Sequence, residues 1–233
     1  MISKNYIIIG GSSGIGKALT NSLASSGHQV YATYNSNPID SNENIIAVRF
    51  NAVNDELDLS VLPDVIDGVV YCPGSINLMP FGRIKPENFR DDFDLQVLGA
   101  IKVVQSLYPQ LIKSDQGSIV LFSTVAVKNG FNFHSQVSVS KGAIEGLTRS
   151  LAAEFAPKVR VNAIAPSLTN TPLASKLINS DNKVEANANR HPLKKIGQPE
   201  DISEMAAFLL SEKAQWITGQ IIHVDGGMST IKL

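Results

Sequence analysis

The sequence predicts a single α/β domain, a Rossmann-like, doubly wound parallel sheet of about seven strands. Short β-branched runs alternate with helical segments from end to end, a glycine-rich turn joins the first run to the first helix, and the 233 residues contain no repeat or linker. Strands joined through helices run parallel, and such a sheet is covered on both faces. We therefore assign residues 1–233 to one domain.

The first strand and the turn after it carry the strongest functional signal. Residues 7–9 are a β-branched run, glycines follow at Gly10, Gly14 and Gly16, and helical periodicity begins at Lys17. Without a Cβ the backbone can approach a pyrophosphate closely, and the free N–H groups of the first helical turn face the anion. An ordinary strand-to-helix turn is the alternative, but the strand–glycine–helix context favours a dinucleotide site.

The other elements follow in alternation along the chain. A polar stretch at residues 179–189 lacks a clear apolar stripe, and we expect it to be a mobile lid or loop. The remaining strands are expected at residues 30–33, 45–50, 68–71, 117–123, 159–165 and 219–224, and the longer helices at 91–111, 138–155 and 199–210.

Composition limits the partners and the compartment. A net charge of −1 without any run of like charges gives no attraction to nucleic acid or to an anionic membrane. The single Cys72 excludes an internal disulfide framework and fits a reducing compartment. We expect a cytoplasmic protein that acts on a small molecule, and we assign no metal site.

Four motifs resemble those of the classical short-chain dehydrogenases/reductases, and the resemblance covers nearly the whole chain. They are the glycine turn at residues 9–16, the segment 71–74, the Pro-x-x-x-x-Thr segment 166–171, and the closing strand with Asp-Gly-Gly at 217–227. The resemblance implies a sheet order of 3-2-1-4-5-6-7 with NAD(P) across the switch point. It also implies a homo-oligomer, a dimer or tetramer, built on the two long helices, where leucines such as Leu107 are either interface or core residues.

The resemblance also implies a set of cofactor contacts. NAD-preferring relatives carry an acidic residue at the end of the second strand, which corresponds to Tyr34 here, so no carboxylate repels a 2′-phosphate and NADP is weakly favoured over NAD. The residues assigned to the cofactor are Gly10, Ser12, Ser13, Gly14, Ile15, Gly16, Tyr34, Asn35, Ser36, Asn51, Cys72, Pro73, Gly74, Lys141, Pro166, Leu168, Thr169 and Thr171.

The catalytic pattern of the family is only partly present. Similar enzymes use an Asn, a Ser, a Tyr and a Lys, and the tyrosine lies four residues before the lysine, on the same helical face, where it transfers a proton as hydride moves. Lys141 is present, but Val137 stands at the tyrosine position, Thr124 at the serine position and Gln96 at the asparagine position. An isopropyl group has no proton to give.

Other side chains are candidates for the missing proton donor. His134 lies seven residues before Lys141, near the tyrosine position of a related enoyl-reductase branch, and histidine titrates near neutrality. The alternative for His134 is a loop residue without chemistry. Thr124 either hydrogen-bonds a carbonyl oxygen or caps the strand end, whereas Ser138 is out of phase with Val137 and should point elsewhere.

Three functions remain open from the sequence. The first is an NAD(P)H-dependent oxidoreductase that acts on a carbonyl or alcohol substrate beneath residues 173–190, with an unusual proton donor such as His134, Thr124 or water relayed from Lys141. The second is a catalytically silent cofactor-binding protein, a sensor or an oligomer partner. The third is non-redox chemistry with a structural cofactor. The sequence does not name the substrate.

Overall fold

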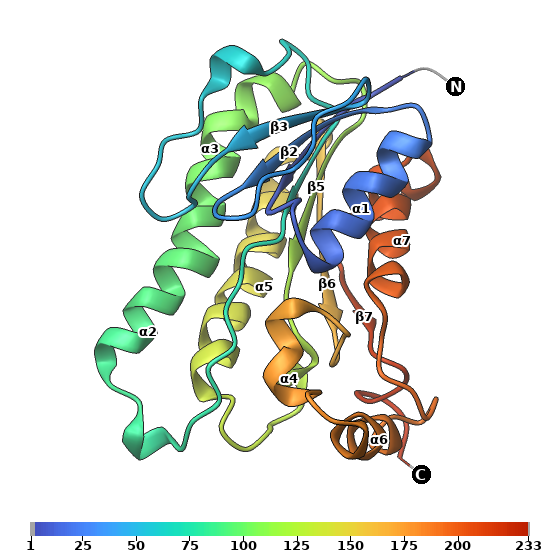
Figure 1. The fold of residues 1–233 in the computed structure, drawn as a ribbon. Coiled ribbons are helices and arrows are strands. Elements are labelled where there is room, and N and C mark those ends of the chain that lie inside the picture. Colours follow the sequence, from blue (N-terminus) through green and yellow to red (C-terminus); the bar gives the residue numbers. More distant parts are fainter. Residues whose placement is uncertain (1–2, 233) are drawn as a thin grey trace.

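A computed structural model of the protein describes residues 3–232 and contains one seven-stranded parallel sheet (Figure 1). The sheet order is β3-β2-β1-β4-β5-β6-β7, which confirms the doubly wound fold. The strands are β1 (Asn5–Ile9), β2 (Gln29–Tyr34), β3 (Ile45–Arg49), β4 (Gly68–Tyr71), β5 (Gly117–Phe122), β6 (Val159–Pro166) and β7 (Ile221–Val224).

Helices cover both faces of the sheet. In Figure 1, α1 and α7 lie on one side of the sheet, and α3 and α5 lie on the other. The helices are α1 (Gly14–Ser25), α2 (Pro86–Phe93), α3 (Gly99–Leu111), α4 (Val125–Lys128), α5 (Ser135–Phe155), α6 (Asp181–Asn189) and α7 (Pro199–Leu210).

The β-branched run of β1 is explained by burial on two faces. Ile7 and Ile9 pack into the core on the α3/α5 side, whereas Ile8 packs into the core on the α1/α7 side, and all three are fully buried. A central strand of a parallel sheet therefore needs apolar residues at every position. Leu107 and Leu111 are also fully buried within the chain, so they are core residues and not interface residues.

The long helix expected at residues 91–111 is interrupted. It begins earlier, as α2, passes through a wide π-helical turn at Asp94–Leu98, and continues as α3 to Leu111. The Tyr71 hydroxyl donates a hydrogen bond to the Leu95 carbonyl in this wide turn. A Cβ at Gly99 would overlap the same hydroxyl. Only glycine at this position leaves room for the phenol beside the helix. Gln96 is one of the buried residues of this wide turn.

The prediction of a loop at residues 179–189 was wrong. The structure contains α6 there, and the Ser180 side chain caps the helix by accepting from the Lys183 N–H. No residue of α6 is fully buried. The helix has no apolar stripe, and a helix without such a stripe is not indicated by the periodicity of the sequence.

Two features are absent from residues 3–232. None of the described helices combines the length and the hydropathy needed to span a bilayer. Among the same residues, no three His, Cys, Asp or Glu side chains gather closely enough to hold a metal ion.

Candidate active site

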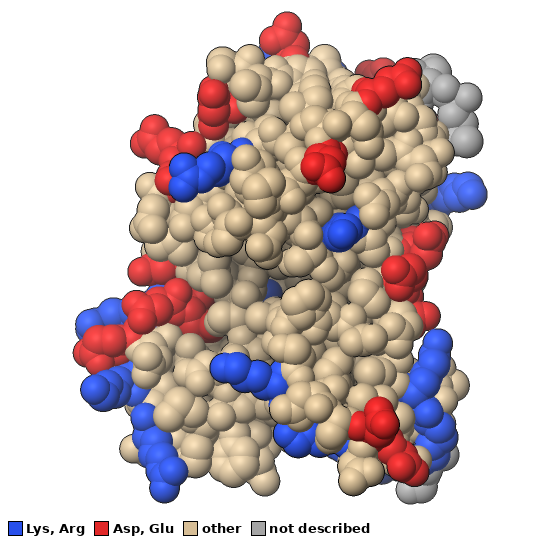
Figure 2. All heavy atoms as spheres, in the orientation of Figure 1, with Lys and Arg blue, Asp and Glu red and all other residues tan. Residues whose placement is uncertain are grey.

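Two adjoining cavities lie at the carboxyl ends of the central strands. The glycine-turn cavity has a volume of about 560 Å³ and is walled by residues 9–10, 12–16, 33, 35–37, 50–53 and 72–74. The Lys141 cavity, about 290 Å³, lies between α5, the strand ends and residues 166–177. The two share wall residues such as Ile15 and Thr171, so they form one cleft, and Figure 2 shows a hollow across the middle of this face. The ends of parallel strands at a switch point are where this fold binds ligands.

The glycine turn has the geometry of an anion cradle. Gly10 has φ +79° and Gly14 has φ +50°, in the left-handed region that favours glycine, and a Cβ at Gly16 would overlap the Gly10 carbonyl oxygen. Ser13 makes no capping hydrogen bond with its side chain. The N–H groups in the first turn of α1 therefore remain available to a phosphate.

The far end of the glycine-turn cavity is polar and lacks carboxylates. Asn35, Ser36 and Asn51 line it, and Asn51 Nδ2 donates to Asn35 Oδ1 at 3.3 Å. Tyr34, which we expected here, lines neither cavity, whereas its neighbour Thr33 does. Successive side chains of a strand point to opposite faces, so a shift of one residue along β2 decides which side chain meets a ligand.

The four expected catalytic side chains all line the Lys141 cavity. Gln96 comes from the π-helical turn, Thr124 from the N-cap of α4 just after β5, His134 from the N-cap of α5, and Lys141 from α5 itself. The segment after β6 forms another wall. The expected cofactor residues Pro166, Leu168, Thr169 and Thr171 are in that wall.

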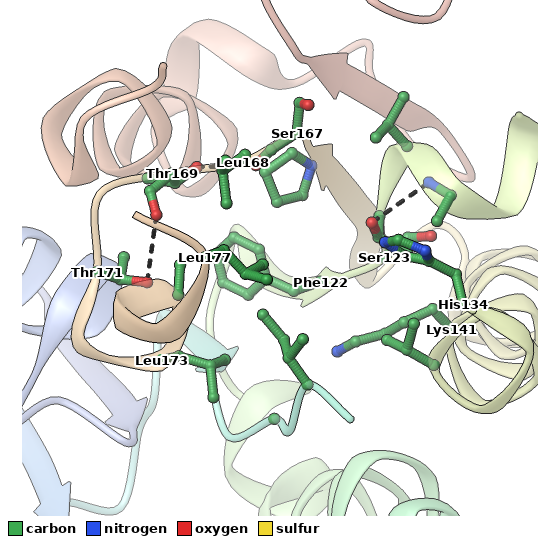
Figure 3. Close-up of a pocket in the computed structure, with 18 of the residues that line it drawn as sticks. Phe122, Ser123, His134, Lys141, Ser167, Leu168, Thr169, Thr171, Leu173 and Leu177 are labelled. Carbon is green, nitrogen blue, oxygen red and sulfur yellow. Dashed lines mark hydrogen bonds between the residues drawn. The ribbon is translucent and has the colours of Figure 1, made fainter. Parts of the chain in front are cut away.

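Lys141 is a buried charged group in the wall of this cavity. Its side chain is 9% exposed and points from α5 into the cavity, with Leu173 and Leu177 on the opposite side (Figure 3). Burial lowers the pKa of Lys141 to about 8, although the negative charge of Asp92 acts in the opposite direction. Within residues 3–232, no carboxylate lies within 4.0 Å of its ammonium group.

The α5 face next to Lys141 offers no second acid. Val137 lies one helical turn earlier, is 8% exposed and lines the cavity with its isopropyl group. The Ser138 hydroxyl donates to the Ala126 carbonyl at 3.1 Å and does not line the cavity, as its position on the helix predicts.

His134 and Thr124 each engage a nearby backbone group. His134 Nδ1 lies 2.7 Å from the Asn132 carbonyl oxygen, and only an N–H can make that contact, so Nε2 of the neutral ring is an acceptor. Thr124 Oγ1 accepts from the Ala126 N–H at 3.3 Å and caps α4, and its hydroxyl proton remains available. The free ring nitrogen of His134 is therefore Nε2, which accepts in the neutral ring and donates in the protonated ring, whereas the Thr124 hydroxyl can donate a hydrogen bond.

The sequence interpretation missed two groups near the cavity. Asp92 is buried behind Gln96 and accepts three side-chain hydrogen bonds. Ser167 Oγ lies 2.8 Å from His191 Nε2, and both residues line the cavity. Neither group has a local sequence signal, apart from the four-residue spacing between Asp92 and Gln96 that puts them on one helix face.

Comparison with known proteins identifies the family. A family model described as Enoyl-(Acyl carrier protein) reductase matches residues 49–229. A solved short chain dehydrogenase family protein from Francisella tularensis superposes with a TM-score of 0.89 at 28% identity, covering 99% of this chain and 100% of that one. The chain belongs to the classical short-chain dehydrogenases/reductases. This is an oxidoreductase family whose members bind NAD(P).

Two further relatives of this short-chain dehydrogenase/reductase bear on its chemistry. The 3-oxoacyl-(acyl-carrier-protein) reductase FabG of Thermotoga maritima is 31% identical over 246 residues, which cover 97% of each protein. A variant of ElxO, solved with NADPH bound, has a TM-score of 0.87 at 25% identity and covers 99% of this chain and 100% of that one.

Proposed function

We propose that this chain is an NAD(P)H-dependent oxidoreductase that interconverts a carbonyl compound and its alcohol. The observation that carries the proposal is the buried Lys141 ammonium in a cavity that adjoins the glycine-turn cavity. When bound, the reduced cofactor supplies hydride to the carbonyl carbon. The chain's part is to orient the substrate, exclude water and provide the proton that the oxygen needs.

We propose that the cofactor is NADP in preference to NAD. The glycine turn at residues 10–16 and the first turn of α1 would hold the pyrophosphate. At the adenosine end the polar side chains are amides and hydroxyls, including Asn35 and Ser36, which can donate to a 2′-phosphate and do not repel it. Thr169 and Thr171 would flank the nicotinamide, as the family pattern implies.

The cavity walls favour a substrate with an apolar chain. Ile76, Leu78 and Leu173 line the Lys141 cavity, together with other aliphatic side chains. Arg190 also lines it and stacks over the Phe131 ring at 5.6 Å, and Lys and Arg side chains gather on the lower half of the face in Figure 2. We therefore propose a ketone or enone with an aliphatic chain and an anionic group, and a 3-oxoacyl thioester is the first candidate because of the reductase named among the relatives.

A catalytically silent cofactor-binding protein is the second candidate. Val137 favours it, because we infer that this isopropyl group occupies the place of the family's acidic tyrosine. The two functions differ in one property, since only the oxidoreductase oxidises NADPH when a carbonyl compound is added.

Calorimetric titration with NADPH, NADH and their oxidised forms is the first experiment, followed by a panel of ketones, enones and 3-oxoacyl thioesters. The oxidoreductase proposal expects tight binding of one cofactor and carbonyl-dependent oxidation that collapses in Lys141→Ala. Tight binding with no turnover on any carbonyl would favour the silent protein. In that case Val137→Tyr should restore activity if the site geometry persists, and absence of any cofactor binding would refute both functions.

A further inference from the structure

A buried carboxylate lies behind the wall of the Lys141 cavity. Asp92, the second-last residue of α2, is 3% exposed. Its Oδ1 accepts from the Ser75 hydroxyl and from Gln96 Nε2, the latter at 2.8 Å, and its Oδ2 accepts from the Ser140 hydroxyl. Three donors from three different segments therefore satisfy a charge that burial alone would disfavour.

The partners of Asp92 connect it to Lys141. Ser140 precedes Lys141 directly on α5, and the negative charge of Asp92 raises the pKa of Lys141 against the effect of burial, as a Cys72 thiolate also would. Burial raises the pKa of Cys72 to about 12, so the thiol is neutral at physiological pH. Asp92 is therefore the counter-charge of Lys141 inside the protein, although the two groups are more than 4.0 Å apart.

Gln96 faces the same space as the ammonium. Asp92 fixes the amide through Nε2, and Gln96 Oε1 is buried with no hydrogen-bond partner. A Cβ placed on Gly74 would lie 3.2 Å from Gln96 Oε1 and 3.8 Å from Lys141 Nζ. The two atoms therefore flank one small space beside Gly74, where an acceptor and a cationic donor converge.

The other groups that face the cavity are weaker candidates for proton donation. Val137 has no proton, Thr124 has only an aliphatic hydroxyl, and His134 has one ring nitrogen engaged with the Asn132 carbonyl. His191 Nδ1 contacts the Asn187 carbonyl oxygen and Nε2 contacts the Ser167 hydroxyl, so neither ring nitrogen is free.

We propose that Lys141 itself donates the proton to the substrate oxygen, and that Asp92 is a positioning residue that supplies its buried counter-charge and holds Gln96 and Ser140 beside it. This inference rests on the proposed reductase function. As the C=O π bond breaks, hydride from NAD(P)H forms the new C–H bond and the oxygen takes the ammonium proton. The neutral amine of Lys141 then regains a proton from water, so the balance is carbonyl plus NAD(P)H plus H⁺ to alcohol plus NAD(P)⁺.

The first test measures Lys141 directly and needs no activity. The ¹³Cε signal of Lys141, assigned with Lys141→Met, is followed against pH in protein labelled with ¹³C-lysine. In Asp92→Asn the titration midpoint of Lys141 should fall by about one pH unit or more, because an opposite charge favours the ammonium. The matched control is Asp91→Asn, the exposed neighbour on the same helix, which should leave the midpoint unchanged. An unchanged midpoint in Asp92→Asn would overturn the role of Asp92.

The second test is the pH profile of kcat/KM for carbonyl reduction by the wild type and Asp92→Asn. If Lys141 is the donor, kcat/KM falls as pH rises through the pKa of Lys141, which gives the profile a descending limb on its alkaline side. In Asp92→Asn this limb should move to lower pH by the same shift as the midpoint of the NMR titration. A merely structural role for Asp92 would lower the rate at every pH without moving the limb. Ser140→Ala, which keeps the charge and loses one donor, should give a smaller shift and serves if Asp92→Asn does not fold.

The two tests separate the failures. If no carbonyl is turned over, the reductase function and proton donation by Lys141 fall together, while the NMR shift alone decides the role of Asp92. If carbonyls are reduced and the limb stays fixed in Asp92→Asn although the NMR midpoint moves, the reductase function stands and Lys141 is not the donor.

Discussion

Lys141 should lower the stability of the folded protein, and Lys141→Met should raise its melting temperature. Burial lowers the pKa of this lysine from 10.5 to about 8. The unfolded chain therefore binds the proton more tightly than the folded chain, and protonation favours unfolding at any pH below about 10. Methionine keeps an unbranched side chain and carries no charge.

The magnitude follows from the pKa difference. Each pKa unit corresponds to about 1.36 kcal/mol, so the change from 10.5 to about 8 amounts to about 3 kcal/mol at pH 7, where Lys141 is protonated in both states. For a chain of this length, about 1 kcal/mol moves the melting temperature by about 2–4 °C, so we expect a rise of about 6–12 °C. The wild type regains this stability as pH rises from about 8 to 10.5, because Lys141 is then neutral in the folded protein and the unfolded chain loses its proton as well. The stability advantage of Lys141→Met should therefore be below about 1 kcal/mol at pH 10.

The assay is thermal unfolding of the cofactor-free protein at pH 7 and pH 10, followed by circular dichroism. The matched control is Lys113→Met, because Lys113 is exposed and its substitution should change stability by no more than about 0.5 kcal/mol. Equal melting temperatures for the wild type and Lys141→Met at pH 7 would refute the reasoning. A stabilisation of the same size at pH 10 would refute its electrostatic origin.

Three further predictions concern the cofactor site and α6. Gly16→Ala should abolish NADPH binding in a calorimetric titration, because the new Cβ would overlap the Gly10 carbonyl oxygen, whereas Gly130→Ala, in open space, should bind normally. Asn35→Asp should weaken the binding of NADPH at least about 10-fold relative to the binding of NADH, because a carboxylate repels the 2′-phosphate. An unchanged ratio of the two dissociation constants would show that Asn35 does not contact the phosphate. Ser180→Ala should destabilise α6 by about 1 kcal/mol through loss of its cap, seen as faster amide exchange confined to that helix.

The sheet could be predicted from the sequence because its strands are buried on both faces. Ile7 and Ile8 belong to the core layers on opposite faces of the sheet. Because both faces are buried, the strand needs an unbroken run of apolar, β-branched residues, and this run is visible in the sequence. The helix α6 could not be predicted in the same way. Its stability depends on a serine cap and on helix-forming polar residues, and neither produces an apolar period.

The candidate site was predicted from the resemblance to the short-chain dehydrogenases/reductases, whose catalytic pattern falls on these positions. Lys141, Gln96 and Thr124 meet because parallel strands end at one edge of the sheet and helical residues four apart share a face. Thr33 was missed because a change of one residue reverses the face of a strand. Asp92 was missed because it looks like Asp91 in the sequence, and only the packing of α2 against α5, where Asp92 accepts from Ser140, buries one of them.

The buried charges bear on the choice between an active and a silent protein. Lys141 and Asp92 are both taken out of water, and replacing a buried pair of charges with apolar side chains of similar size is often neutral or stabilising. Binding of a dinucleotide's phosphates requires the glycine turn and the first turn of α1, and neither involves Asp92. A protein that only bound the cofactor would therefore gain no binding energy from a buried carboxylate behind Gln96. A lysine that donates a proton must be an ammonium before each transfer, and a nearby negative charge stabilises that ammonium. The chain's own electrostatics thus favour the oxidoreductase over the silent protein.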